Sequence, residues 1–160
     1  MSAFALFGIS TLMSLVSSVV LVQLYVWPRL QMMSHDQALF VLLTPHMFLR
    51  FLGLSFLMPG VVSPALPAAF AVPAAYGDFA AGILAIAAAV ALSRRTSWAR
   101  ALVWLFNIWG AADFLFAFVQ GARAPIDPAA LGAAFFIPTA VVPPLLVTHA
   151  LIFRLLVRPK

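Results

Sequence analysis

The stretch Ala38–Val62 reads ALFVLLTPHMFLRFLGLSFLMPGVV and places one full positive charge, Arg50, inside a predominantly apolar run. As a helix, the run is long enough to cross the hydrocarbon core of a bilayer, which takes about 20 apolar residues. A charged side chain near the bilayer centre costs roughly 2.5–3.5 kcal/mol by insertion measurements. A chain keeps such a charge where it is paired, faces a water-filled cavity or serves a function. The stretch therefore predicts a membrane span that carries a buried polar site.

The composition of the whole chain is that of a membrane protein. Its 160 residues are 65% hydrophobic and 8% charged, with a mean hydropathy of +1.11, whereas soluble domains average about 25% charged residues. Apart from Arg50, the nine basic residues sit at the ends of apolar runs and not on one hydrophilic face, so we expect no nucleic-acid partner. Cysteine is absent from the sequence, which excludes disulfides, thiolate catalysis and cysteine-ligated metals.

Five apolar runs are long enough to cross a bilayer, and turn-forming residues separate them. We expect the spans at Ala3–Trp27, Gln37–Leu57, Pro73–Leu92, Ala99–Phe118 and Ala129–Leu156. Trp27-Pro28-Arg29 is expected to end the first helix, and Pro59-Gly60 the second. The prediction is an all-α integral membrane protein, a single polytopic domain over residues 1–160 with five transmembrane helices. The first span lacks a basic leader and a small-residue cleavage site, so we expect it to be retained.

The basic residues predict the orientation of this bundle. With five spans, one side of the membrane holds most of them: Arg29, Arg94, Arg95, Arg100, Arg154, Arg158 and Lys160. The other side holds only Arg123. Because cytoplasmic loops carry the Lys/Arg excess, we expect the N-terminus outside and the C-terminus in the cytoplasm. The Ala, Pro and Arg usage is typical of a GC-rich bacterial genome, and so a multi-pass protein of the bacterial inner membrane is predicted.

Six polar side chains inside these spans form a candidate ligand or proton site: His46, Arg50, Asp78, Asn107, Asp113 and His149. His46 and Arg50 are four residues apart, so they project from one face of the second span. Asn107, Gly110 and Asp113 follow at three-residue steps along one side of the fourth span. We expect Arg50 to bridge the two aspartates, with Asn107 and the two histidines deeper in the bundle. Gly110 is expected to leave room for a partner backbone or a ligand.

The role of this polar layer has two interpretations. Arg50 either clamps helices together by neutralising their aspartates, or belongs to a site for a ligand or a proton. Two carboxylates and one guanidinium leave an excess negative charge unless a carboxyl or a histidine is protonated, an arrangement typical of proton-coupled sites. In the functional interpretation Arg50 holds an anionic group or gates the site, the aspartates set its charge, and His46 and His149 exchange protons.

The fifth span contains three prolines, Pro138, Pro143 and Pro144. Each removes a backbone donor and frees the carbonyl four residues earlier. Non-helical backbone at membrane depth survives only where protein or a watery cavity covers it, and transporters use such breaks to expose backbone to a substrate. The alternative is a simple kink whose freed carbonyls are satisfied by a neighbouring helix.

The functional hypotheses belong to three classes. The sequence has no phosphate-binding glycine loop, nucleophile elbow or metal-spaced His/Glu cluster, so it does not indicate an enzyme or a metal site. The leading hypothesis is a protein that binds or transports a small solute or lipophilic ligand at the Arg50 layer. The second is a small b-type cytochrome whose haem b is held by His46 and His149, because histidine is a common axial ligand. The third is an accessory subunit of a larger membrane complex, or a homo-oligomer, whose polar layer only holds helices together.

Overall fold

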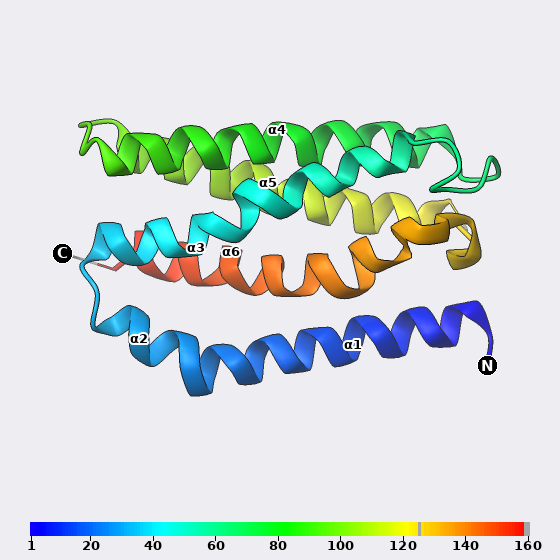
Figure 1. The fold of residues 1–160 in the computed structure, drawn as a ribbon, viewed down its shortest axis with the longest axis horizontal. Coiled ribbons are helices and arrows are strands. Elements are labelled where there is room, and N and C mark those ends of the chain that lie inside the picture. Colours follow the sequence, from blue (N-terminus) through cyan, green and yellow to red (C-terminus); the bar gives the residue numbers. More distant parts are fainter. Residues whose placement is uncertain (125, 159–160) are drawn as a thin grey trace.

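The computed structural model describes residues 1–124 and 126–158, which form helices packed lengthwise against one another (Figure 1). Within this described part, five helical segments are long and apolar enough to span a membrane: Ala3–Gln31, His35–Leu57, Ala68–Ser93, Ala99–Arg123 and Ile137–Leu156. The predicted number of apolar helices is therefore confirmed. Successive segments run in opposite directions, so each connection joins two neighbouring ends of the bundle (Figure 1).

The first segment continues past the proline that was expected to end it. It comprises α1 (Ala3–Leu21), one π-helical stretch η1 (Val22–Val26) and α2 (Trp27–Gln31). In η1 the N–H of Trp27 donates to the carbonyl of Val22, a wider register than that of an α-helix. This change of register makes room for the ring of Pro28 in the first turn of α2, where a missing N–H is tolerated. The prediction that the helix ends at Trp27 was wrong for this reason.

The second segment begins as an α-helix and ends as a 3-10 helix. α3 (His35–Leu49) starts with a capping box, in which Ser34 and Gln37 each bond the other's backbone N–H through their side chains. The box explains why the helix starts two residues before the predicted Gln37. At Arg50 the chain tightens into η2 (Arg50–Leu57). The charged residue therefore stands at the junction of two helix types.

The third segment, α4 (Ala68–Ser93), starts five residues before its predicted first residue and holds Pro73 inside it. Pro73 removes the donor that the carbonyl of Ala69 would otherwise have. The side chain of Gln120 supplies a replacement at 3.5 Å. Gln120 lies in the last turns of α5 (Ala99–Arg123), which runs past its predicted end at Phe118. The earlier start of α4 and the later end of α5 are linked. The additional residues of α5 include Gln120, which bonds the carbonyl that Pro73 leaves without a donor.

The last segment is broken in two places where a single span over Ala129–Leu156 was predicted. Pro128–Phe135 forms the 3-10 stretch η3, Ile137–Val141 the π-helical η4, and Val142–Leu156 the helix α6. The part apolar and long enough to span a membrane starts at Ile137, so the predicted start at Ala129 was wrong. As in the first segment, the π-helical stretch directly precedes prolines in the first turn of an α-helix. The carbonyl of Ala140, freed by Pro144, accepts from Ser14 Oγ of α1 at 3.4 Å, as the kink interpretation expects.

Residues 58–67 connect η2 to α4, and this α3–α4 connection packs on η3 at one end of the bundle. The N–H of Ala133 donates to the carbonyl of Val61 at 2.9 Å, and the N–H of Ser63 donates to that of Ala130 at 2.9 Å. Between these bonds Gly132 has a φ of +54°, and a Cβ there would overlap the carbonyl oxygen of Val61. The glycine thus lets two irregular segments join and cover this end.

Two apolar cores fill the bundle, one towards each end. α6 contacts α1, α3 and α5, while α4 packs on α3, η2 and α5 through a face made largely of alanine. Along α6, for example, Leu145 belongs to one core and Leu151 to the other, with His149 between them. In α3, α4 and α5, too, polar residues separate the residues that pack in one core from those that pack in the other. The polar residues of the spans therefore occupy a layer between the two cores.

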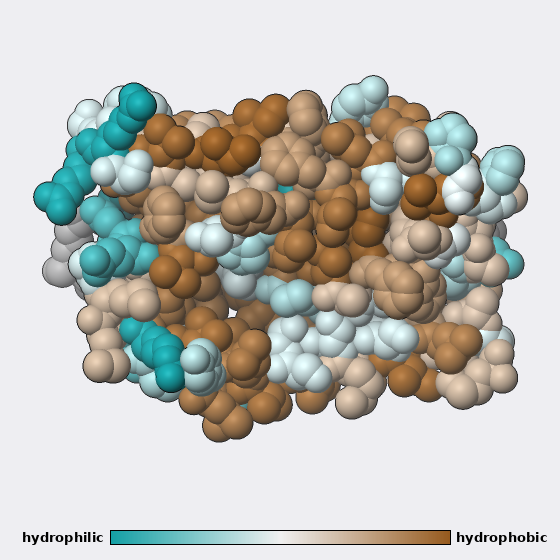
Figure 2. Space-filling view, viewed as in Figure 1, coloured by the Kyte–Doolittle hydropathy of each residue, from teal (hydrophilic) through white to brown (hydrophobic). Residues whose placement is uncertain are grey.

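The outer surface is largely hydrophobic, and its basic residues gather at one end (Figure 2). They surround the end of α2, the α4–α5 connection and the end of α6: Arg29, Arg94, Arg95, Arg100, Arg154 and Arg158. The guanidinium of Arg154 lies 4.0 Å from the ring centroid of Trp27, so the first and last spans meet there. Arg123 stands at the opposite end. Lys160, which was expected on the basic side, lies outside the described residues.

Candidate ligand site

Arg50 is the centre of the polar layer and is only 1% exposed. Its Nη1 donates to Asp78 Oδ1 at 2.5 Å and to Asp113 Oδ2 at 2.8 Å. Its Nη2 donates to the carbonyl of Gly110 at 2.8 Å, and its Cζ lies 3.6 Å from the ring centroid of Phe114. The guanidinium thereby joins the α3–η2 junction to α4 and α5, in the bridge that the sequence leads us to expect.

His149 contacts the second terminal nitrogen of the guanidinium, Nη2. Arg50 Nη2 lies 2.8 Å from His149 Nε2, and His149 Nδ1 lies 2.6 Å from Asn107 Oδ1. Asn107 Nδ2 donates to the carbonyl of His149 at 3.2 Å, which fixes the orientation of the amide. Because an amide oxygen only accepts, Nδ1 carries the proton and Nε2 accepts from Arg50. The surroundings thus hold His149 as one neutral tautomer.

His46 belongs to the layer through packing. Its ring centroid lies 4.4 Å from that of His149 and 4.9 Å from that of Phe106. Its Nε2 is 2.8 Å from Thr148 Oγ1, while the Thr148 hydroxyl donates to the carbonyl of Leu145 at 2.8 Å. Nε2–H is then the donor to Thr148, and Nδ1 has no hydrogen-bond partner among the described residues.

Three glycines make the close approach of these groups feasible. A Cβ on Gly110 would lie 2.7 Å from Arg50 Nη2 and 2.6 Å from His149 Cε1. The room that the sequence predicts at Gly110 is therefore filled by two side chains of the layer. A Cβ on Gly53 would overlap the carboxylate of Asp78, and one on Gly77 would overlap that of Asp113. Gly53 and Gly77 were missed in the sequence, where the only signal is their nearness in the chain to Arg50 and Asp78.

The two buried histidines do not fit an axial pair for haem b. Axial imidazoles bind the iron from opposite faces of the macrocycle, yet these ring centroids are 4.4 Å apart with no space for a porphyrin between them. Both ring nitrogens of His149 are also engaged, by Arg50 and by Asn107. Among the described residues, no group of three or more His, Asp or Glu side chains is placed to hold a metal ion.

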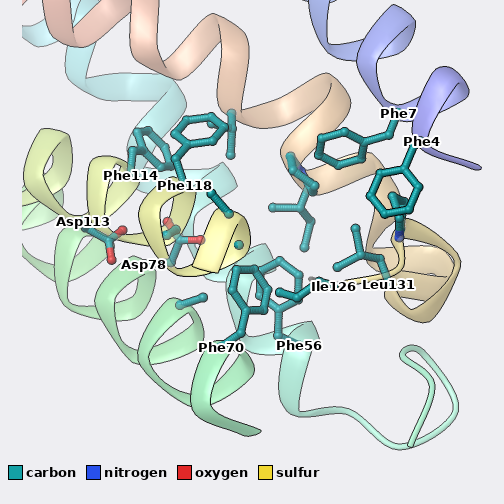
Figure 3. Close-up of a pocket in the computed structure, with 18 residues that line it drawn as sticks. Phe4, Phe7, Phe56, Phe70, Asp78, Asp113, Phe114, Phe118, Ile126 and Leu131 are labelled. Carbon is teal, nitrogen blue, oxygen red and sulfur yellow. The ribbon is translucent and has the colours of Figure 1, made fainter. Parts of the chain in front are cut away.

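A cavity of about 250 Å³ adjoins the carboxylates (Figure 3). Six phenylalanines from α1, η2, α4 and α5 line it: Phe4, Phe7, Phe56, Phe70, Phe114 and Phe118. Asp78 and Asp113 are the charged residues of its wall, and Arg50 is not part of that wall. An anion in the cavity would therefore meet carboxylates and not the guanidinium, which differs from the expected role of Arg50 in holding an anionic group.

The proline-broken segment forms another part of the cavity wall. Leu131 of η3, Ile137 and Pro138 of η4, and Val142 of α6 all line it. The irregular backbone expected to face either protein or a substrate cavity thus stands beside this cavity. Of the three prolines of this span, Pro138 is next to the space that a ligand would occupy.

A protein-family model described as a domain of unknown function, DUF8737, matches residues 6–157. The chain belongs to this family. No curated protein and no solved structure gives a significant match. The matched residues include the polar layer, most of the cavity wall and all five apolar helices except the first three residues of α1, so the match extends over nearly the whole bundle.

Proposed function

We propose that this DUF8737 chain is a multi-pass membrane protein that binds or transports a small lipophilic ligand in the cavity beside Asp78 and Asp113. Its apolar surface supports insertion, since no residue of α1 is buried within the described bundle although the helix has no charged residue and belongs to a segment with a mean hydropathy of 2.2. The basic end would face the cytoplasm of a bacterial cell by the positive-inside rule. The N-terminus and the cavity would then lie towards the outer leaflet of the inner membrane.

The observation that carries the proposal is the cavity itself. Ligand sites are concave, mostly apolar and supplied with a few placed polar groups, and this wall combines six phenyl rings with two carboxylates. A clamp alone explains why Arg50 pairs with both aspartates. It gives no reason for open space on their other side. The clamp and the ligand site are compatible, because Arg50 pairs with the carboxylates without itself lining the cavity.

A cavity-filling variant with a matched control tests this function. Ala117 lines the cavity, whereas Ala112 is exposed on the same helix one and a half turns earlier. Thermal unfolding of the purified protein in nonionic detergent is measured with benzyl alcohol, phenylacetate and benzyltrimethylammonium. A ligand that binds only the folded state stabilises it by RT ln(1 + L/Kd), where L is the free ligand concentration. We expect at least one compound to stabilise the wild type and Ala112→Phe but not Ala117→Phe.

The opposite pattern would refute the proposal. If none of the three compounds stabilises the wild type, or if Ala117→Phe responds as Ala112→Phe does, the cavity is not a ligand site. The polar layer would then have only its structural role, and reproducible co-purification with other membrane proteins would favour the accessory-subunit hypothesis.

A further inference from the structure

The buried charges do not balance. Arg50 supplies one positive charge, and Asp78 and Asp113 supply two negative charges when both are ionised. His149 adds none, because its Nδ1–H donates to Asn107 and its Nε2 accepts from Arg50. A proton on Nδ1 of His46 would have no acceptor among the described residues, so this ring is neutral as well. An uncompensated charge is strongly disfavoured in such a place. The layer therefore needs one more positive charge, either a proton on a carboxyl or a separate cation.

Asp78 and Asp113 both line the cavity. Each aspartate uses one oxygen to accept from Arg50 Nη1, namely Asp78 Oδ1 and Asp113 Oδ2. In the described part of the chain no hydrogen-bond donor reaches the remaining oxygens, Asp78 Oδ2 and Asp113 Oδ1, which pack against Gly53 and Gly77. Asp78 is only 7% exposed, yet it lines the cavity, and an oxygen of its carboxylate points into it (Figure 3). A cation that completes the charge balance would sit in this cavity, which the two aspartates line and Arg50 does not.

The rest of the wall suits a cation with an apolar body. Apart from the two carboxylates, the described lining side chains are Phe, Ala, Gly, Ile, Leu, Val and Pro, none of which donates a hydrogen bond. An anion in the cavity would have no hydrogen-bond donor among these side chains and would be repelled by the two carboxylates. Phenyl faces attract ammonium groups, and they do so more strongly where water is excluded. Phe114 already serves in this way for Arg50, whose Cζ lies 3.6 Å from its ring centroid.

We propose that the ligand is a lipophilic monocation, a protonated or quaternary amine with a small aromatic or branched alkyl body. This assignment rests on the ligand site proposed above and specifies its substrate class. The ammonium group sits against Asp78 and Asp113, and the body lies among the phenylalanines nearer the rim, where Phe4 and Phe118 are 62% and 45% exposed. The volume of about 250 Å³ exceeds that of an apolar cavity of about 150 Å³ known to bind benzene, so a benzyl-sized cation fits.

Two probes of the same shape and different charge test the assignment. Benzyltrimethylammonium carries a quaternary nitrogen where neopentylbenzene carries a carbon. Their dissociation constants are measured on the full chain in nonionic detergent, each referred to the free probe concentration after binding to empty micelles is subtracted. We expect the cation to bind at least tenfold more tightly. Asp113→Asn should weaken the cation at least tenfold and leave neopentylbenzene unchanged, whereas Asp36→Asn, at the other end of the bundle, should change neither.

The outcomes separate this inference from the function on which it rests. If neopentylbenzene binds as tightly as the cation, and Ala117→Phe blocks it, the cavity is a ligand site and the cation assignment is overturned. If neither probe binds the wild type, the cation assignment fails, and the ligand site itself fails once phenylacetate and benzyl alcohol are also negative. Should Asp113→Asn not fold, the comparison of the two probes on the wild type still decides the charge preference.

Discussion

Arg50→Leu measures how strongly the polar layer stabilises the bundle. The substitution removes two ion pairs to Asp78 and Asp113 and the hydrogen bonds to Gly110 and His149. Hydrogen bonds between membrane helices average about 0.6 kcal/mol each, so four contacts would account for roughly 2–3 kcal/mol. Removing one partner of a buried ion pair costs about 3–5 kcal/mol, because the other charge is left buried without compensation. We expect a loss in this upper range.

The design separates the lost charge from the lost packing. In Arg50→Leu combined with Asp78→Asn and Asp113→Asn, no charge is left unpaired, so more than half of the lost stability should return. Arg123→Leu changes an exposed arginine at the end of α5 and should alter stability by less than about 0.5 kcal/mol. The free energy of unfolding is obtained by titrating the purified proteins with dodecyl sulfate in mixed micelles.

A small effect would refute the reasoning. If Arg50→Leu costs less than about 1 kcal/mol, the guanidinium does not compensate the two buried carboxylates as the geometry implies. If the triple variant is no more stable than the single one, the loss comes from packing around Arg50 and not from unpaired charge.

Three further results are expected. Gly110→Ala should lower the free energy of unfolding by about 1–3 kcal/mol, because its Cβ would displace Arg50 and His149; an unchanged dodecyl sulfate titration would contradict the close contact. Gly132→Ala should speed amide hydrogen exchange in the α3–α4 connection, because an alanine at a φ of +54° is strained and meets Val61, and unaltered exchange there would count against this packing. Protein purified from haem-replete cells should show no Soret band before or after reduction; such a band, lost in His149→Ala, would overturn the histidine arrangement described above.

The spans and the polar layer could be predicted because both depend on local sequence. Hydropathy over about 20 residues identifies a span, and the depth of a residue follows from its distance along the helix. Counting residues therefore placed Arg50 level with Asp78 and Asp113 before any packing was known. Counting residues does not give the rotation of each helix about its own axis. This rotation decides that the carboxylates, and not the guanidinium, line the cavity.

The helix boundaries wrongly predicted at prolines have one physical cause. In the folded bundle, other features make up for the hydrogen bonds that the prolines remove. Pro28 and Pro73 were taken as helix boundaries because proline removes a local hydrogen bond. In the bundle, a π-helical register before Pro28 and the side chain of Gln120 near Pro73 make up for that loss. Neither remedy has a local sequence signature. Gly53 was likewise missed, because its role is to admit a carboxylate from another helix.

Photolabelling tests most directly that the cavity admits a lipophilic molecule. A small iodophenyl diazirine partitions into micelles and marks any surface it reaches, and mass spectrometry locates the adducts. Phe56 and Leu131 line the cavity but are only 5% and 4% exposed, so lipid-side contact alone cannot label them. The account predicts adducts on both in the wild type and in Ala112→Phe, and their loss in Ala117→Phe. Adducts confined to exposed side chains, or unaffected by Ala117→Phe, would contradict it.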